Sequence, residues 1–457
     1  PYIEAYLYKF LKIFNQDINL LRVAYLTPFY LSIVAIIAAF LIGKKISGNL
    51  AALVAGVLIA VNPTVLSRSF GSDNDIVNVV FPLIIMLFTM YAFSSKKINM
   101  TAIFAGITGF FIGVYSFAWS GWWFMFLFLL AASFIYLGYI ALIEIINKGN
   151  TIQNLKSNNK VLLIGVFVIV LFISSYISLG LFGNSQHFFS IFIKNPLKII
   201  TIQAASRGTS IWPNVYTTVA ELNSANFDHI IGSLGGKIFL WLALIGSTLS
   251  LVKFNSKNSK TKLVNYSYLV GSSIYYLIFI GIAQSASLNM YLTLGLLSLP
   301  MFIGLVLSSI YNYKIEPMNS ILMIIWFMAT IYSSTKGIRF ILLIVPVFVI
   351  SFSTFIGIMV NEISNIFSKM FDLNVSIPKT IFIIIALLVL IQPINTGRAT
   401  AYSYAPSVND GWVDSLTKIK AESQDDAIIN SWWDFGHWFY TISERKVTFD
   451  GADQDRR

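Results

Sequence analysis

Long apolar stretches alternate with short polar ones along almost the whole chain. A hydropathy window marks about twelve of them as candidate membrane spans, because a helix crosses a bilayer with about 20 apolar residues. Their approximate limits are 24–43, 48–66, 76–94, 99–118, 121–145, 160–182, 237–253, 263–284, 290–311, 319–335, 338–361 and 378–395. Two segments, 183–236 and 396–457, are polar and mixed, so we expect them to lie outside the membrane.

Composition supports a membrane protein over a soluble one. Of the 457 residues, 56% are hydrophobic and only 11% are charged, which leaves too little polar surface for a soluble chain of this size. The net charge of +11 could indicate nucleic-acid binding, but in a membrane protein it more often reflects lysines kept on the cytoplasmic side. We therefore expect no nucleic-acid partner. The absence of cysteine excludes disulfides and thiolate sites.

The lysines predict an orientation. They cluster after alternate spans, for example at Lys44 and Lys45, at Lys96 and Lys97, and at Lys160. If the chain alternates, all of these loops share one side, and the positive-inside rule makes it cytoplasmic. The remaining loops are then external: 67–75, 119–120, 183–236, 285–289, 336–337 and 396–457.

The first candidate site is the run Ser431-Trp432-Trp433-Asp434-Phe435-Gly436-His437-Trp438. Two indole N–H donors beside a carboxylate acceptor can form a pocket for a small hydroxyl group. Gly436 permits a tight backbone turn behind that pocket. The alternative is an aromatic core turn of a soluble domain.

The second candidate is Asp73-Asn74-Asp75, ahead of an apolar helix. Two carboxylates in this arrangement can bind a hard divalent cation such as Mg²⁺ or Mn²⁺. The alternative is simple capping of the helix that follows.

Two further external segments carry single charged residues. Thr218-Val219-Ala220-Glu221 lies in the long polar loop, where the same pattern also describes an ordinary capping box. Arg339 opens a long apolar span, where it could bind a phosphate through its guanidinium or simply extend to the membrane interface.

Taken together, these motifs resemble the catalytic subunit of oligosaccharyltransferase, archaeal AglB type, a family related to bacterial PglB and to the eukaryotic catalytic subunit. The resemblance rests on the Trp-Trp-Asp-Phe-Gly run, the acid-x-acid pair after Ser67-Arg68, the Thr-x-x-Glu pattern and the Arg-Phe pair, all in the family's order. It implies an all-α polytopic membrane protein of the GT-C type, with thirteen spans. It also implies a single-subunit enzyme in the cell membrane, with its active site on the external face.

The resemblance also implies roles for individual residues. Trp432, Trp433 and Asp434 would bind the acceptor's serine or threonine hydroxyl, and Arg339 would contact the donor phosphate. The metal, Mn²⁺ or Mg²⁺, would be held by Asp73, Asp75 and Glu221, and the catalytic residues would be Glu221 and Asp73. The spacing between Arg68 and the acidic pair is shorter than the family's, so Arg68 receives no role.

The implied reaction is protein N-glycosylation with inversion, from a dolichyl phosphate or diphosphate oligosaccharide to asparagine in Asn-X-Ser/Thr. A first span and a catalytic aspartate are expected to precede Pro1, which makes 1–23 the remnant of the first external loop. Residues 24–395 would be the transmembrane domain, and 396–457 the start of a truncated external soluble domain.

Two other function classes remain open at this point. Another dolichyl-phosphate-sugar glycosyltransferase, such as a protein O-mannosyltransferase, would share the spans but would not need the Trp-Trp-Asp pocket. A membrane transporter would carry ionisable or helix-breaking sites at mid-membrane.

Overall fold

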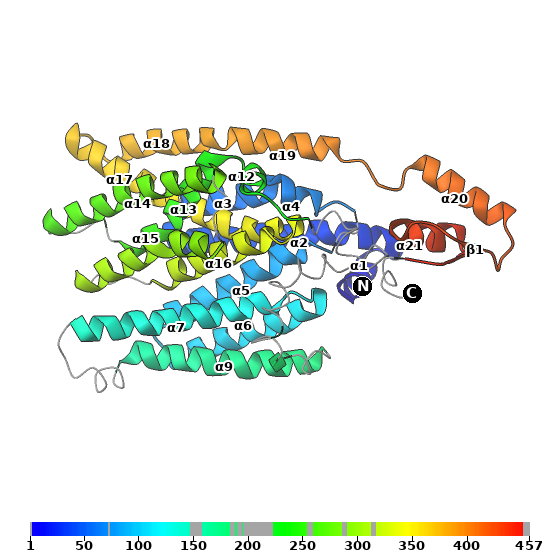
Figure 1. Cartoon of the computed structure of the whole chain (residues 1–457), viewed down its shortest axis with the longest axis horizontal. Helices are drawn as coiled ribbons and strands as arrows, with labels where there is room; N and C mark the ends of the chain where they lie inside the picture. The colour runs from blue at the N-terminus through cyan, green and yellow to red at the C-terminus, as the bar shows by residue number, and fades with distance from the viewer. Residues whose placement is uncertain are drawn as a thin grey trace. The chain divides into compact units, whose positions relative to one another are not determined.

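The structure is a computed structural model, and it describes residues 2–71, 74–146, 158–182, 188–189, 194, 223–252, 254, 259–285, 290–311 and 317–450. Within these ranges the chain is almost entirely helical (Figure 1). The membrane-type helices and their short companions are α1 (Tyr2–Phe14), α2 (Leu20–Ser47), α3 (Asn49–Val61), α4 (Pro63–Ser67), α5 (Val77–Ser94), α6 (Ile98–Ala118), α7 (Trp123–Ile146), α9 (Asn159–Leu181), α12 (Phe227–Ser233), α13 (Lys237–Thr248), η3 (Leu249–Leu251), α14 (Ser259–Ser285), α15 (Met290–Ile310), α16 (Met318–Ser334), η4 (Ile338–Leu343), α17 (Ile344–Met370), α18 (Ser376–Val389) and α19 (Ile391–Ser403).

The predicted spans correspond to these helices one by one. Nine helices in the described ranges are long and apolar enough to cross a membrane, or ten if the bent pair α12 and α13–η3 counts as one span. The expected segments 48–66 and 319–335 become α3 and α16, which are apolar but only 13 and 17 residues long. The predicted all-α polytopic membrane class is confirmed, although fewer than twelve helices among the described residues reach full spanning length.

Helix α17 forms the centre of the membrane unit. It packs against α2, α3, α13, α16 and α18, and most of its residues are buried. By contrast α18 leaves a row of large apolar side chains exposed, among them Ile377, Ile381 and Ile385. Exposed apolar rows on long apolar helices suit contact with lipid chains.

Small residues bring α6 and α9 close together. The Ser174 hydroxyl on α9 donates to the Gly106 carbonyl on α6 at 2.6 Å. A Cβ atom added at Gly109 would lie 2.7 Å from the Ser174 Cβ, and one added at Gly113 would lie 2.3 Å from the Ser178 Cβ. Glycines spaced in this way are a common means of close helix packing in membranes, where apolar burial does not favour protein over lipid.

The span predicted at 237–253 is formed by α13 and η3, and the short helix α12 precedes it at a sharp bend. Helices α12 and α13 meet at an angle of 86°. Between them Gly235 and Gly236 have φ values of 89° and 116°, which side-chain-bearing residues rarely adopt. The glycine pair therefore permits the sharp bend that a hydropathy window does not detect.

The chain divides into two compact units, and described residues 402–450 lie in the second. Its elements are α20 (Asp410–Glu422), β1 (Ile428–Ile429), η5 (Trp433–Phe435), α21 (Gly436–Trp438), η6 (Phe439–Ser443) and β2 (Lys446–Val447). The two short strands pair in parallel, with Ile428 opposite Lys446. Trp412 of α20 packs on Phe435 and Trp438, each with ring centroids 5.2 Å apart.

Candidate active site

Two arginines and one aspartate meet in the membrane unit. The Arg68 Nη1 atom lies 3.6 Å from one carboxylate oxygen of Asp75, and the Arg339 Nη2 atom lies 3.9 Å from the other. All three side chains remain partly exposed. The structure thus brings together the start of α5 and the start of η4, as their shared external assignment predicts, and it adds Arg68.

Local structure fixes the position of Arg68. Pro63 opens the short helix α4, and the Asn62 side chain accepts hydrogen bonds from the backbone N–H groups of the next turn. Arg68 follows directly as the C-terminal cap of α4. Its neighbour Ser69 is buried and hydrogen-bonds the Ser32 hydroxyl on α2, with 2.6 Å between the two oxygens. The Asn62 cap at the start of α4 and the Ser69–Ser32 hydrogen bond just after its end hold Arg68 in place.

Asp75 lies in the turn just before α5. The N-cap position of this helix is taken by Ile76, which makes no side-chain capping bond. Asp75 therefore lies one residue before the N-cap position, and capping by Ser72 or Asp73, which lie outside the described residues, stays a prediction. One turn further on, buried Asn78 accepts a hydrogen bond of 2.8 Å from the Tyr115 hydroxyl, which ties the start of α5 to α6.

The electrostatics of this cluster favour an anion. Among the described residues, two guanidinium groups lie near one carboxylate, so these three side chains together carry one excess positive charge. Both distances exceed the roughly 2.7–2.9 Å of a strong charge-assisted hydrogen bond. A guanidinium pairs well with the oxygens of a phosphate.

Two predicted residues of this site, Asp73 and Glu221, lie outside the described residues. The described part of the chain holds no group of three or more His, Cys, Asp or Glu side chains that could bind a metal. Asp75 alone supplies one hard oxygen ligand, which suits Mg²⁺ or Mn²⁺ only if further carboxylates join it. The metal assignment therefore stays a prediction.

The tryptophan run of the second unit has two sides. Phe435 and Trp438 pack on Trp412, whereas Trp432 and Asp434 are exposed and Trp433 is half-buried. The two neighbouring indole rings have centroids 6.2 Å apart. The alternative of a purely structural aromatic turn explains only Phe435 and Trp438, because the Trp432 and Asp434 side chains face outward.

Gly436 lies directly against the backbone that follows β2. A Cβ atom there would lie 2.1 Å from the Phe449 carbonyl oxygen and 2.7 Å from the Asp450 Cα. Only glycine allows the chain after β2 to approach so closely. Gly436 itself has ordinary helical angles, φ −55° and ψ −44°, so the close approach of this backbone requires glycine here, and the predicted need for glycine's conformational freedom does not apply.

Arg445 binds the end of α20 in the second unit, and no sequence motif indicates this role. Its side chain is only 5% exposed. It donates hydrogen bonds to the Lys420 and Ser423 carbonyls at the end of α20, at 2.7 and 2.9 Å, and pairs with Asp425 at 3.2 Å. A cation at a helix C-terminus is stabilised by the free carbonyl groups there. A lone arginine in a polar segment carries no signal that would distinguish it from a surface residue.

Comparison with known proteins adds a family match. Residues 1–394 match the family model described as oligosaccharyl transferase STT3, N-terminal. A dolichyl-phosphooligosaccharide-protein glycotransferase from Methanococcus voltae is 26% identical over 99% of this chain and 52% of its own length. One from Methanocaldococcus jannaschii is 26% identical over 74% of this chain and 36% of its own length. The chain thus spans about half or less of the relatives it matches.

Solved structures give a matching fold. The apo oligosaccharyltransferase of Archaeoglobus fulgidus superposes with a TM-score of 0.57 and 15% identity, covering 99% of this chain and 56% of its own. A complex of AglB from the same organism with an inhibitory peptide and a dolichol-phosphate gives a TM-score of 0.53 and 14% identity, covering 98% and 56%. A complex with zinc and sulfate gives a TM-score of 0.56 and 15% identity, covering 98% and 54%.

Proposed function

Because the chain belongs to the oligosaccharyl transferase STT3 family, we propose that it carries the membrane part of a protein N-glycosylation enzyme. The enzyme transfers an oligosaccharide from a dolichyl phosphate or diphosphate carrier to the asparagine of Asn-X-Ser/Thr, at the external face of the cell membrane. It acts as a single subunit. The observation that carries the proposal is the meeting of Arg68 and Arg339 at Asp75, where an anionic leaving group would be held.

The donor end of the reaction uses the two arginines. As the bond between the anomeric carbon and the phosphate oxygen breaks, its electron pair stays on the phosphate. Arg339 and Arg68 stabilise that growing negative charge, because preorganised cations aimed at a developing charge lower the barrier. The AglB structure from Archaeoglobus fulgidus contains a dolichol-phosphate, which supports a lipid-linked donor of this kind.

The acceptor end needs carboxylates. An amide nitrogen is a poor nucleophile, since its lone pair is delocalised into the carbonyl. In our proposal Glu221 and Asp73 hydrogen-bond the asparagine N–H₂, orient its nitrogen toward the anomeric carbon and take up the proton that it loses. Attack from the side opposite the phosphate inverts the anomeric centre.

A divalent cation belongs to the same proposal. Asp73, Asp75 and Glu221 would hold it, and it would supply further positive charge at the phosphate. Oxygen ligands favour Mn²⁺ or Mg²⁺. The zinc complex of the Archaeoglobus fulgidus enzyme supports a divalent site in this fold.

The tryptophan run supplies acceptor selection. The exposed Asp434 carboxylate can accept a hydrogen bond from one small hydroxyl group, and the neighbouring Trp432 and Trp433 indole N–H groups can donate to the same hydroxyl. We assign it to the serine or threonine of the acceptor. The inhibitory peptide in the Archaeoglobus fulgidus complex supports a peptide acceptor.

The test is glycan transfer to a labelled Asn-X-Thr peptide by membranes that hold the full-length protein, with native lipid extract and Mn²⁺. Asp434→Ala should sharply reduce transfer, and EDTA should abolish it. Asp414→Ala, which removes an exposed carboxylate of α20 in the same unit, is the matched control and should leave transfer unchanged. An unchanged transfer rate in Asp434→Ala would contradict the proposed hydroxyl pocket. Sugar attached to serine or threonine of a peptide that lacks asparagine would instead favour an O-mannosyltransferase.

A further inference from the structure

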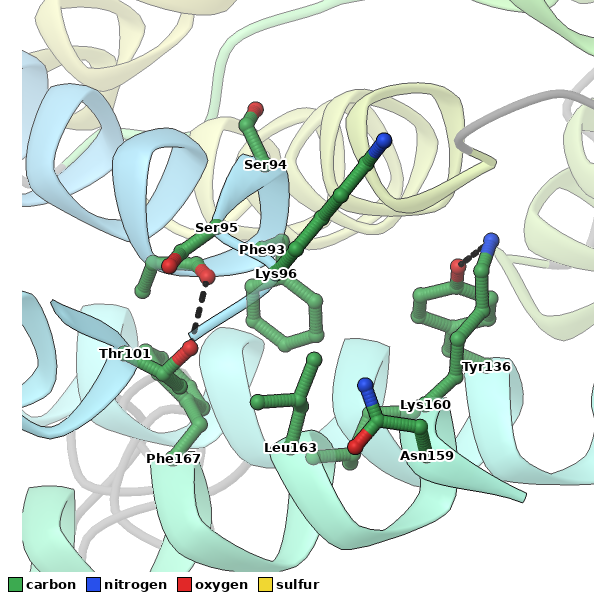
Figure 2. A pocket seen from close by; sticks show the side chains of 12 residues that line it. Phe93, Ser94, Ser95, Lys96, Thr101, Tyr136, Asn159, Lys160, Leu163 and Phe167 are labelled. Carbon is green, nitrogen blue, oxygen red and sulfur yellow. Dashed lines mark hydrogen bonds between the residues drawn. The ribbon is translucent and has the colours of Figure 1, made fainter. Parts of the chain in front are cut away.

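A small pocket lies at the opposite ends of the helices from Asp75, among the last turn of α5, the loop after it, α7 and the first turns of α9. It has a volume of about 180 Å³. Figure 2 shows the side chains that line it, with the Lys96 and Lys160 ammonium groups toward the upper part of the view and Leu163 and Phe167 below them. This pocket takes no part in the proposed transfer reaction.

The floor of the pocket is apolar and well packed. The Phe93 ring lies 4.7 Å from the Phe167 ring and 6.0 Å from the Tyr136 ring, centroid to centroid. Phe167 and Ile164 are almost fully buried. These packed rings offer contact to the apolar part of a ligand.

The rim of the pocket is basic. Lys160 donates to the Tyr136 hydroxyl at 3.2 Å, which holds its ammonium group beside the pocket. Lys96 is exposed in the loop after α5, and that loop is tightened by Ser95, whose hydroxyl bonds the backbone of Lys97. None of the lining residues in the part of the chain that the structure describes carries a carboxylate. The rim therefore favours an anion.

From these features we propose that the pocket binds the phosphate-bearing headgroup of an anionic phospholipid. Lys96 and Lys160 hold the phosphate, and the start of one lipid chain lies against Phe93 and Leu163. The pocket is smaller than the roughly 300 Å³ at which sites for whole small molecules begin. A lipid needs less room, because its chains continue along the outside of the bundle.

The position of the lysines assigns the leaflet. Lys45 lies at the same end of the bundle, 4.5 Å from the ring centroid of Tyr91 on α5. Loops rich in lysine face the cytoplasm, and basic pockets between helices on that side are typical headgroup sites. The lipid is thus a member of the cytoplasmic leaflet.

The experiment is native mass spectrometry of the purified chain in detergent, titrated with dioleoylphosphatidylglycerol, with dioleoylphosphatidylcholine or with inorganic phosphate. One phosphatidylglycerol should stay bound per chain, and phosphatidylcholine should bind more weakly. Each of Lys96→Gln and Lys160→Gln should weaken retention about fivefold, and the double variant about thirtyfold. The matched control is Lys97→Gln, the next residue in the same loop, which does not line the pocket and should retain the lipid.

A second variant separates a pocket from a merely charged surface. Leu163→Trp keeps both lysines but fills the space, and it should abolish retention of the single lipid while the elution volume of the protein stays the same. Equal binding of both lipids, equal loss in Lys97→Gln, or full retention in Leu163→Trp would overturn the proposal. Displacement of the lipid by inorganic phosphate at equal concentration would also overturn it, since the site would then be one for the free ion.

Discussion

The Arg339 Nη2 atom and an Asp75 carboxylate oxygen lie within ion-pair distance, 3.9 Å apart, although the two residues are far apart in the sequence. Arg339 stands in the first turn of η4, where the chain re-enters the bundle as α17. Asp75 stands one residue before the N-cap of α5. The contact joins the predicted phosphate-binding residue to a predicted metal ligand, and Arg68 approaches the same carboxylate from α4.

Replacing Arg339 should slow glycan transfer in the full-length protein. Arg339→Met removes the guanidinium and should lower kcat by about 10²–10³, the usual loss when one donor to a developing charge is deleted. Arg339→Lys keeps the charge but not the two-pronged geometry, so its loss should be smaller. The measurement is the initial rate of transfer to a labelled Asn-X-Thr peptide at saturating peptide.

The control for this prediction is Lys336→Met. Lys336 lies three residues earlier, with its ammonium group 5.5 Å from the Tyr332 ring centroid. Its loss should leave the rate near that of the wild type. Equal rates for Arg339→Met and Lys336→Met would contradict a role for Arg339 in the reaction.

The sequence predicted much of this arrangement, and for identifiable reasons. The lengths of the apolar segments predicted most spans. The alternation of successive loops between the two sides of the membrane predicted that Asp75 and Arg339 lie on the same side. Arg68 was set aside because its spacing to the acidic pair differs from the family's. The structure shows that α4 and its caps bring its guanidinium to Asp75 regardless of that spacing. Spacing along the chain does not measure distance across a turn.

A hydropathy window did not predict three other features: the bend at Gly235, the short lengths of α3 and α16, and the contacts of Arg445. The bend at Gly235 depends on backbone angles, and the shortness of α3 and α16 depends on where turns begin. Arg445 donates hydrogen bonds to backbone carbonyls at the end of α20, and no sequence motif predicts such bonds. Predicted roles for Asp73 and Glu221 concern residues outside the described ranges and stay predictions.

The close packing of α6 on α9 should not tolerate a larger residue at Gly113. A side chain there meets Ser178, whose Cβ lies 2.3 Å from the position of an added Cβ. Gly113→Leu should force the helices apart and cost about 1–3 kcal/mol of stability, as overpacking usually does. The measurement is the midpoint of thermal unfolding of the purified chain in detergent.

Gly138→Leu is the comparison for that variant. Gly138 lies within α7, and an added Cβ there meets no atom within 4 Å. It should unfold at nearly the temperature of the wild type. A similar drop in both variants would mean that a leucine in any of these helices is harmful, and that the α6–α9 contact is not special.

The turn that carries the tryptophan run should depend on Gly436. Gly436→Ala places a methyl group against the Phe449 carbonyl and the Asp450 Cα, so that backbone must move. We expect faster hydrogen–deuterium exchange of amides in 428–450, equivalent to a loss of about 1–3 kcal/mol in local stability. Gly411→Ala in α20, where an added Cβ lies 3.4 Å from the Asn409 side chain, should leave exchange nearly unchanged. Unchanged exchange in Gly436→Ala would show that the turn can adapt.

The Lys420–Glu444 ion pair should make the second unit slightly more stable at neutral pH than in acid. The Lys420 ammonium lies 2.6 Å from a Glu444 carboxylate oxygen, and its hydrogen bond and charge, with Arg445 adding to them, lower the pKa of Glu444. The unfolded chain has the ordinary glutamate pKa of about 4.3. The pair therefore contributes fully above that pKa, and its contribution is lost as pH falls through the lower pKa of the folded state.

The measurement is amide exchange of 428–450 in wild type and Glu444→Gln between about pH 7 and about pH 3, after correction for intrinsic exchange rates. The two proteins should differ at neutral pH and converge in acid. The difference should also shrink with added salt, because both side chains are well exposed. Glu422→Gln, which removes the longer 3.8 Å pair with Lys418, should show less pH dependence. A wild-type advantage that persists at the acid end would mean that Glu444 stabilises the turn by a contact other than its charge.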